Sequence, residues 1–395
     1  MPTRHAPQAL HLVLRRERTG CGDMVRRATR GRRVALVGLA LHLTLIVAAA
    51  GPARAAEPAR PAPPAALAGT AANAAPHAVV LMYHRFGEDR YPSTSIRLSQ
   101  FEGHLRALRD GGYTVLPLRQ IVEALRAGAP LPPRSVGISV DDAYASVHRE
   151  AWPRLRAAGY PFTLFVSTDA LDRGYGGMLT WDELREMVRG GGVDVGNHTA
   201  SHPHLADRDG AFAEREIDRA QQRLREELGS APVLFAYPYG EHGAAARAAV
   251  AARNFLAAFG QQSGAIGPQG DLMNLPRFAL NESYGEPARF AVVAGALPLA
   301  AHDVTPADGL LAPGDNPPRL SFRVAAEAGG LERLACYLTG GGKLTLRVSA
   351  GRRVTVDVPQ PLAPGRSRIN CTLPAPSGAW QWFGLQYYVP GPAVR

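Results

Sequence analysis

Two adjacent aspartates, Asp141 and Asp142, follow the apolar stretch SVGISV at residues 135–140. Neighbouring like charges repel, so one carboxyl of such a pair has a raised pKa unless a cation holds both. His198 and His202 stand four residues apart in HTASH, and they also follow a strand-like stretch. Two histidines and a carboxylate can bind one ion and leave coordination positions open, as catalytic sites require. The sequence therefore predicts a metal site in which one aspartate binds the ion and the other is positioned as a base.

The segments around these residues predict a parallel sheet covered by helices. Short apolar runs such as AVVLMY and PFTLFVS alternate with amphipathic segments such as LRQIVEALRAG from residue 78 to about residue 260. Repeated units of this kind suit a (β/α) barrel better than an open sheet, although periodicity alone does not exclude the open sheet. In both folds functional residues gather where strands end and loops begin. We expect the two aspartates and the two histidines to meet at such an edge.

The helical pattern stops near residue 300, and six short alternating stretches separated by glycine and proline follow. They predict a small antiparallel β-sandwich of about 85 residues. Cys336 and Cys371 lie in this region, and the third cysteine, Cys21, lies near the N-terminus. In an exported chain two such cysteines favour a disulfide, with two buried free thiols as the alternative. We expect this β-rich region to dock on the barrel or to bind glycan.

The formal charge of +10 comes mainly from residues 1–55, which contain ten arginines against two acidic residues. The remaining residues hold 34 basic and 32 acidic side chains, so we exclude nucleic acid as a partner. Five of them, Arg26, Arg27, Arg30, Arg32 and Arg33, precede the apolar run VALVGLALHLTLIVAAAG, and the small residues ARA follow it, a pattern typical of a secretion signal. An uncleaved N-terminal anchor is the alternative. We predict an exported protein, periplasmic or extracellular, and leave association with the membrane or the export machinery open.

These patterns together predict four parts of the chain. Residues 1–55 are the leader, and residues 56–76 are a linker rich in proline and alanine. Residues 77–300 are the barrel, and residues 301–395 are a β-rich accessory domain. The predicted fold class is α/β, a distorted (β/α) barrel followed by a small antiparallel β-sandwich-like domain.

Three motifs, ISVDDAY, HTASH and FAYPYG, resemble in their order and separation those of the polysaccharide deacetylases, the NodB-like family 4 carbohydrate esterases. The opening VLMYHRF resembles the branch that deacetylates poly-N-acetylglucosamine, in which a late motif is permuted to the N-terminus. The resemblance covers about residues 78–290. It implies hydrolysis of N-acetyl groups on a polysaccharide by a divalent metal, with zinc as our first choice and cobalt, nickel and iron as alternatives.

The resemblance also implies a role for each residue that matches a motif. It implies a metal-ligand set of Asp142, His198 and His202. Asp141 becomes the general base, and His84 becomes the acid that protonates the departing amine. The backbone N–H of Tyr239 is expected to stabilise the tetrahedral oxyanion. Ser201, between the two histidines, is expected to form a hydrogen bond within its loop rather than to act as a nucleophile.

Two positions depart from the family pattern. Ala143 stands where the first motif usually has glycine, so we expect an ordinary backbone conformation there instead of a positive φ. The arginine that often precedes the third motif and pairs with the base has no counterpart near Ala236. Arg277, in LPRFALNESYG, is a candidate replacement. It also follows a strand-like stretch, so the chain can bring its side chain back to the site.

Several other side chains have both a functional and a structural interpretation. The candidate substrate-binding aromatics are Tyr144, Tyr237 and Trp181, and packing at an element boundary is the alternative. His204 is expected to face solvent rather than to bind metal. The polar loop at residues 260–267 either lines a substrate groove or only connects two elements. The charges of residues 213–227 are expected to form a solvated helix face.

Two other functions compete with deacetylation. Two histidines and one carboxylate also form the facial triad of non-haem iron oxygenases, but such a site needs no second adjacent aspartate. A catalytically degenerate glycan-binding protein on the same fold is favoured by Ala143 and by the missing arginine. Because the proposed base and all three proposed ligands are present, deacetylation is our preferred function.

Overall fold

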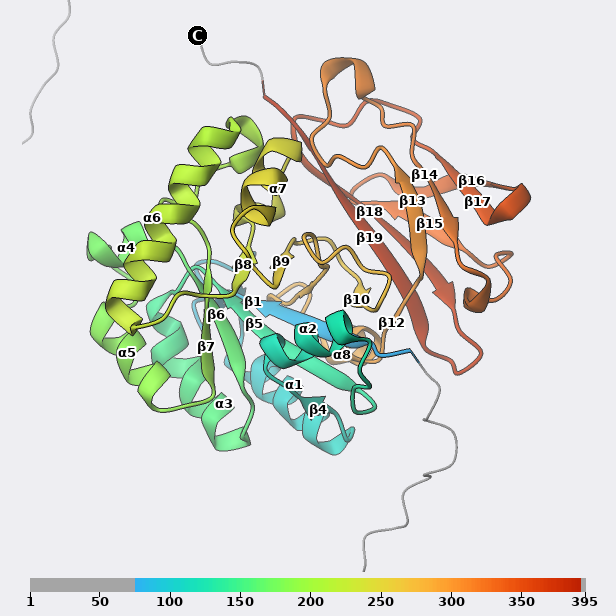
Figure 1. Ribbon diagram of the computed structural model, residues 1–395. Helices are drawn as coiled ribbons and strands as arrows, with labels where there is room; N and C mark the ends of the chain where they lie inside the picture. The colour runs from blue at the N-terminus through green and yellow to red at the C-terminus, as the bar shows by residue number, and fades with distance from the viewer. Residues whose placement is uncertain (1–74, 392–395) are drawn as a thin grey trace, which may run out of the picture. The chain divides into compact units, whose positions relative to one another are not determined.

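The computed structural model describes residues 75–391. The predicted leader and nearly all of the predicted linker lie outside the described residues. Between residues 75 and 391, no helix has the length and apolar character needed to cross a membrane. The described residues belong to one compact unit, in which a curled sheet surrounded by helices precedes a second, β-rich part (Figure 1).

A nine-stranded sheet forms the first part, and its main path runs in the order β10-β1-β5-β6-β7-β8-β9. Its strands are β1 (Ala78–Tyr83), β4 (Thr114–Val115), β5 (Ser135–Asp141), β6 (Phe162–Val166), β7 (Val193–Asn197), β8 (Leu234–Ala236), β9 (Ala257–Phe259), β10 (Ala265–Ile266) and β11 (Phe278–Ala279). Phe259 of β9 bridges to Leu275 in parallel, and β11 just beyond pairs with β1. The sheet thus curls toward closure through an irregular segment, which confirms the predicted distorted barrel.

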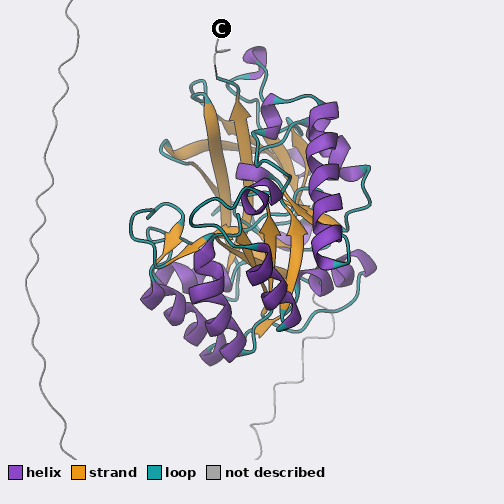
Figure 2. Cartoon of the chain, turned by 90° about the vertical axis from the view of Figure 1, so that its left-hand side faces the viewer, coloured by secondary structure: helices purple, strands orange, loops and turns teal. Residues whose placement is uncertain are grey.

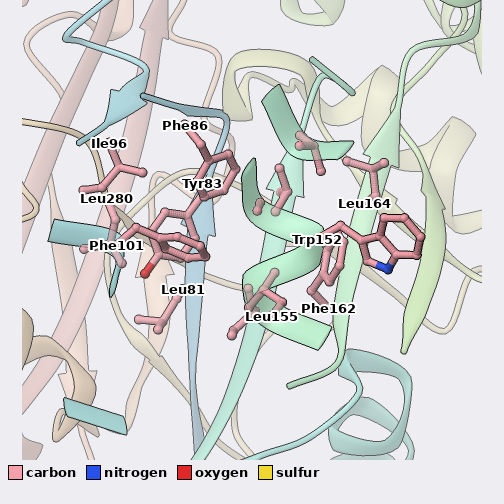
Figure 3. Close-up of a cluster of buried hydrophobic side chains, with 14 of the residues drawn as sticks. Leu81, Tyr83, Phe86, Ile96, Phe101, Trp152, Leu155, Phe162, Leu164 and Leu280 are labelled. Atoms are coloured by element: carbon pink, nitrogen blue, oxygen red, sulfur yellow. The ribbon is translucent and has the colours of Figure 1, made fainter. Parts of the chain in front are cut away.

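Helices cover the outside of these strands (Figure 2). They are α1 (Leu98–Asp110), α2 (Leu118–Ala127), α3 (Trp152–Ala158), α4 (Thr168–Asp172), α5 (Trp181–Arg189), α6 (Gly210–Leu228), α7 (Ala244–Ala251) and α8 (Pro287–Ala294). A π-helical turn at Val147–Ala151 leads into α3, and a small separate sheet pairs β2 (Arg85–Phe86) with β3 (Ser95–Ile96). Aromatic and aliphatic side chains fill the space between strands and helices; those labelled in Figure 3 include Tyr83, Phe86, Phe101, Trp152 and Phe162.

His104 of α1 is a buried polar member of this core. Its ring stacks on Phe290 of α8 with centroids 4.0 Å apart. Its Nε2 donates to the Gly285 carbonyl at 2.7 Å, which leaves Nδ1 to accept from the Tyr83 hydroxyl at 3.0 Å. Burial lowers the pKa of His104 to about 4, and the nearby charges of Arg289 and Glu286 act on it in opposite directions. The folded protein therefore holds this histidine neutral.

We expect His104 to make the protein less stable in acid. In the unfolded chain this histidine takes up a proton below its ordinary pKa of about 6.5, whereas the folded protein does so only near pH 4. The unfolded state therefore binds more protons between these values, and by pH 5 the loss of stability is about 2 kcal/mol. Urea unfolding of the wild type and of His104→Gln at pH 7 and pH 5 measures this. The variant should lose about 2 kcal/mol less than the wild type on acidification, and the exposed control His302→Gln should lose as much as the wild type.

The second part of the unit is an eight-stranded sheet with the order β12-β19-β18-β15-β16-β17-β14-β13. Its strands are β12 (Leu297–Pro298), β13 (Ala301–Thr305), β14 (Ser321–Val324), β15 (Ala335–Leu338), β16 (Gly342–Ser349), β17 (Arg353–Asp357), β18 (Gly365–Pro374) and β19 (Trp380–Val389). The sequence predicted a sandwich, but the strands follow one continuous hydrogen-bonded path. Phe322 of β14, Val354 of β17 and Ile369 of β18 still share one buried cluster. The two halves of the sheet therefore enclose a common core, as the halves of a sandwich do.

Cys336 of β15 and Cys371 of β18 lie opposite each other in the antiparallel ladder and form a disulfide, as the sequence favoured. The bridge links positions 35 residues apart. A cross-link of this span restricts the unfolded chain and contributes about 3–4 kcal/mol in the chain-entropy model. We expect the Cys336→Ala/Cys371→Ala double variant to lose about that much free energy of unfolding in urea titrations. Wild type unfolded under a reducing agent should match the variant, and an unchanged unfolding midpoint in both would contradict the prediction.

Candidate active site

The chain bends sharply where β5 ends. Asp141 is the last residue of β5, and the next two residues have positive φ angles, 74° at Asp142 and 59° at Ala143. The expectation of ordinary backbone at Ala143 is therefore wrong. The Asp142 N–H donates to the Phe165 carbonyl and the Ala143 carbonyl accepts from the Leu179 N–H, so tertiary hydrogen bonds impose the bend. A left-handed conformation at a non-glycine residue costs roughly 1–2 kcal/mol.

Backbone strain of this kind is concentrated around the candidate site. Nine described non-glycine residues have positive φ, and five of them belong to the three motifs ISVDDAY, HTASH and FAYPYG. These five are Asp142, Ala143, Thr199, His202 and Tyr239. Strained backbone persists where the surrounding structure imposes it, and it is enriched at functional sites. The pattern marks the place where β5, β7 and β8 end as the functional edge of the barrel.

Asp142, His198 and His202 come together at this edge. Their potential ligand atoms all lie within 4.8 Å of one another. Asp142 Oδ1 is 3.4 Å from His198 Nε2 and 3.1 Å from His202 Nε2. Both Asp142 Oδ1 and His198 Nε2 are buried without a hydrogen-bond partner in the described part of the chain. Buried polar atoms are normally satisfied, so these residues fit a divalent cation held between them.

The surroundings of His198 fix which nitrogen can bind a metal. Its Nδ1 lies 2.7 Å from the Ala236 carbonyl and donates to it, which leaves the Nε2 lone pair free. Burial acts to lower the pKa of His198, but the Asp142 and Asp141 carboxylates outweigh it and raise that pKa. Burial likewise acts to raise the pKa of Asp142, and the two histidines hold it well below its ordinary value. The cluster therefore attracts positive charge.

The loop that carries the histidines is held by α6. The two histidines do not lie on a helical turn, because Thr199 and His202 both have positive φ. Glu216 accepts from the Ser201 N–H at 2.7 Å and from the Ser201 hydroxyl at 2.8 Å, and its side chain is buried. Ser201 thus bonds to α6 rather than within its own loop, and we identify no nucleophilic role for it.

The expectation that residues 213–227 form only a solvated face is wrong at Glu216. Glu216 shares the buried stripe of α6 with Ala213, Ile217 and Ala220. A glutamate at a core position of an amphipathic helix needs a buried partner. The helical spacing of Glu216 with the apolar residues was the signal in the sequence that could have predicted its hydrogen bonds to the histidine loop.

Asp141 forms a buried ion pair with Arg277. Both side chains are fully buried, and the guanidinium donates Nη1 to Oδ1 at 2.7 Å and Nη2 to Oδ2 at 2.8 Å. Arg277 also donates Nε to the Gly260 carbonyl at 2.9 Å. Burial would raise the pKa of Asp141, but Arg277 and the neighbouring histidines hold it below its ordinary value. The structure thus places Arg277 beside Asp141, as the sequence hypothesis required, while the catalytic role of the pair stays a prediction.

A cavity of about 720 Å³ opens over these residues, and Asp142, His84 and His202 line it. His84 Nε2 is 3.9 Å from Asp141 Oδ2, and burial is the main cause of its lowered pKa. Tyr239 also lines the cavity, and no described residue accepts a hydrogen bond from its N–H. A cavity with a histidine, an available backbone N–H and adjacent candidate metal ligands can hold a polar substrate group.

Of the three candidate substrate-binding aromatics, only Tyr144 lines the cavity, where the Arg85 guanidinium lies 3.4 Å from its ring centre. The structure corrects the other two. Tyr237 is fully buried, and its hydroxyl donates to the Met273 carbonyl. Trp181 lies outside the cavity at the start of α5, where its indole N–H donates to Asp172.

Two loop residues near the site, His204 and Gln261, had both a functional and a structural interpretation in the sequence. The His204 side chain is half exposed, as expected, but its ring stacks on Tyr239 with centroids 4.2 Å apart and its Nδ1 contacts Glu241 at 2.6 Å. In the polar loop at residues 260–267, Gln261 reaches the cavity wall, which favours the groove interpretation for this residue.

Residues 128–257 match the family model described as polysaccharide deacetylase. This segment is similar to the polysaccharide deacetylases. The match includes both aspartates and both histidines of the metal-site motifs, and it confirms the family resemblance of the sequence.

The chain is also similar to several named proteins. The poly-beta-1,6-N-acetyl-D-glucosamine N-deacetylase of Escherichia coli (strain K12) is 28% identical over 189 residues, which cover 37% of this chain and 28% of that protein. The structure of IcaB from Ammonifex degensii is 27% identical, with a TM-score of 0.51, and the match covers 55% of this chain and 97% of that chain. The Streptococcus pyogenes deacetylase PplD in complex with acetate is 21% identical, with a TM-score of 0.52 over 55% of this chain and 98% of that chain, and shows the fold alone. This chain thus spans less than a third of the E. coli protein's length.

Proposed function

We propose that the protein is a metal-dependent hydrolase that removes N-acetyl groups from an exported polysaccharide containing N-acetylglucosamine, of the poly-β-1,6-linked class. The observation that carries this proposal is the convergence of Asp142, His198 and His202 beside a cavity, with two ligand atoms buried and unpartnered. The family match and the name of the E. coli relative support the reaction and the substrate class. Zinc remains our first choice of metal, with cobalt, nickel and iron as alternatives, because this ligand set suits all four.

Each remaining residue of the site has a proposed task. When bound, a divalent cation supplies polarisation of the acetamide carbonyl and lowers the pKa of a water molecule. Asp141 accepts the proton of the attacking water, and Arg277 keeps its carboxylate ionised and oriented. The Tyr239 N–H donates to the oxyanion as the carbonyl carbon becomes tetrahedral. His84 donates a proton to the departing amine, so that acetate and a free amino sugar result.

The proposal is tested with the purified full chain, stripped of metal and reloaded with zinc or cobalt. Acetate release is measured from β-1,6-linked N-acetylglucosamine oligomers and, in parallel, from chitin oligomers. We expect metal-dependent release from the β-1,6-linked oligomers, and a loss of at least about 100-fold in Asp141→Asn. The exposed control Asp182→Asn should keep the wild-type rate.

Two outcomes would contradict the deacetylase proposal. A tightly bound metal without acetate release from either glycan would favour the glycan-binding protein. Oxygen consumption with iron and a 2-oxo acid, again without acetate release, would favour the oxygenase.

A further inference from the structure

The C-terminal sheet supplies part of the wall of the cavity that contains the metal-ligand set. Arg366 and Arg368 of β18 line this cavity together with Asp142 and His202 of the barrel. Because side chains alternate along a strand, both arginines extend from the same face of the sheet. The substrate cavity is therefore built jointly by the barrel and by a sheet whose strands lie far away in the sequence.

The Tyr239 ring contacts both Arg366 and His202 of the proposed metal-ligand set. The Arg366 guanidinium carbon is 5.3 Å from the centre of the Tyr239 ring, and that ring packs on His202 with centroids 4.4 Å apart. Its Nη1 donates to the Tyr239 carbonyl at 3.4 Å, and its Nε lies 3.4 Å from Glu241 Oε1. Arg366 is therefore held beside the loop that contains Tyr239, and Glu241 is its carboxylate partner.

Arg368 differs from Arg366 because no described residue offers it a carboxylate within salt-bridge distance. Its Nε donates to Gln386 Oε1 at 2.8 Å, and its Nη2 donates to Gln261 Oε1 at 3.3 Å. Both partners are neutral amides. Burial, together with repulsion from Arg366, lowers the pKa of Arg368, although an arginine stays protonated in proteins. Among the described residues, Glu241 acts on this charge electrostatically but forms no salt bridge with Arg368, so the cavity wall contains a positive charge without a paired carboxylate.

The other charges of the cavity wall do not supply this compensation. Arg173 also lines the cavity, but it pairs with Asp169 at 3.2 Å, and Asp169 pairs in addition with Arg219 at 2.6 Å. Among residues 75–391, the only other carboxylate on the wall is Asp142, which belongs to the proposed metal-ligand set. The side of the cavity formed by the C-terminal sheet thus has an excess of positive charge.

We propose that Arg368, with Arg366 beside it, binds an oxyanion group carried by the glycan, specifically the carboxylate of an acidic sugar near the N-acetylated one. A half-buried guanidinium with unused N–H donors recognises a planar carboxylate through paired, charge-assisted hydrogen bonds. The inference rests on the proposed deacetylase function and adds that the natural polymer is acidic. The C-terminal sheet then selects the substrate, and the barrel carries out the chemistry.

The test uses matched pairs of β-1,6-linked N-acetylglucosamine oligomers, from dimer to pentamer. In one member of each pair the terminal C6 hydroxyl is oxidised to a carboxylate, and the length series varies its distance from the acetamide groups. Calorimetry with the metal-free full chain should show about tenfold tighter binding of the oxidised oligomer for at least one length. That preference should fall below about twofold in Arg368→Gln and persist in Arg347→Gln, an exposed arginine elsewhere on the same sheet.

The outcomes separate this inference from the deacetylase proposal. Equal binding of both oligomers at every length, or an equal weakening of both by Arg368→Gln, would overturn the inference. So would competition by free acetate that depends on Arg368, because the arginine would then hold the reaction product. A charge preference without acetate release under any metal contradicts only the deacetylase proposal, whereas acetate release without a charge preference contradicts only the role of Arg368.

Discussion

Replacing Asp142 with asparagine is expected to lower the affinity for zinc by at least about 100-fold and to abolish metal-dependent acetate release. Asp142 Oδ1 lies 3.4 Å from His198 Nε2 and 3.1 Å from His202 Nε2, and Asp142 would supply the only anionic ligand of the proposed set. An amide oxygen in the same place has no charge with which to compensate a divalent cation. The fold itself should survive, because asparagine has nearly the same shape and Asp142 Oδ1 makes no hydrogen bond to the described residues.

Thermal unfolding with and without zinc measures this prediction independently of catalysis. A ligand present at 100 times its dissociation constant stabilises the folded state by about 2.7 kcal/mol, so zinc should raise the melting temperature of the wild type. Zinc should leave the melting temperature of Asp142→Asn nearly unchanged, and the exposed control Asp182→Asn should respond as the wild type does. Equal stabilisation of Asp142→Asn and wild type by zinc would remove Asp142 from the metal-ligand set.

The parts of the site that the sequence predicted depend on short-range chemistry. Asp142 and the histidine motif were recognisable because each follows an apolar strand, and parallel strands end at a common edge. Arg277 was a candidate because we expected it to follow a strand; in the structure it instead directly precedes β11, a short strand that pairs with β1. Local hydrophobic patterns largely set where a strand ends, so these ends were predictable despite the irregularities of this barrel.

The conformations that the sequence predicted wrongly depend on contacts between distant segments. Ala143 has a positive φ because Phe165 and Leu179 hold the bend by hydrogen bonds, and no residue next to Ala143 announces them. Tyr237 and Tyr239 are two residues apart in the same motif, yet Tyr237 continues from β8 into the core while Tyr239 turns into the cavity. Tyr239 follows a proline and has a left-handed backbone conformation, which accounts for the different directions of the two side chains.

The basic wall of the cavity could not be read from the sequence. Arg366 and Arg368 lie more than 120 residues after the third motif, in a stretch whose alternation predicted only a strand. Their position follows from docking of the C-terminal sheet, in which Gln386 of β19 donates to the Tyr239 carbonyl at 3.0 Å. Specificity that arises where two parts of a chain meet leaves no local motif, so only the three-dimensional structure brings it into view.

Replacing Arg277 with methionine is expected to lower the free energy of unfolding by about 3–5 kcal/mol, because it leaves the Asp141 carboxylate buried and unpaired. The pair has no solvent-exposed surface on either side chain, and the guanidinium binds both carboxylate oxygens. Urea unfolding of the metal-free protein measures this loss. A decrease smaller than about 1 kcal/mol would show that Asp141 takes up a proton or finds another partner.

The double variant Asp141→Leu/Arg277→Met separates stability from catalysis. Apolar side chains of similar volume remove both charges, so the double variant should recover most of the stability that Arg277→Met alone loses. It should nevertheless release no acetate, because it lacks the proposed base. A double variant that is stable, binds zinc as the wild type does and is inactive would identify the ion pair as part of the catalytic machinery. If it kept turnover, the proton would have to go to another group, and His84, which lines the cavity and whose Nε2 lies 3.9 Å from Asp141 Oδ2 in the wild type, is the candidate.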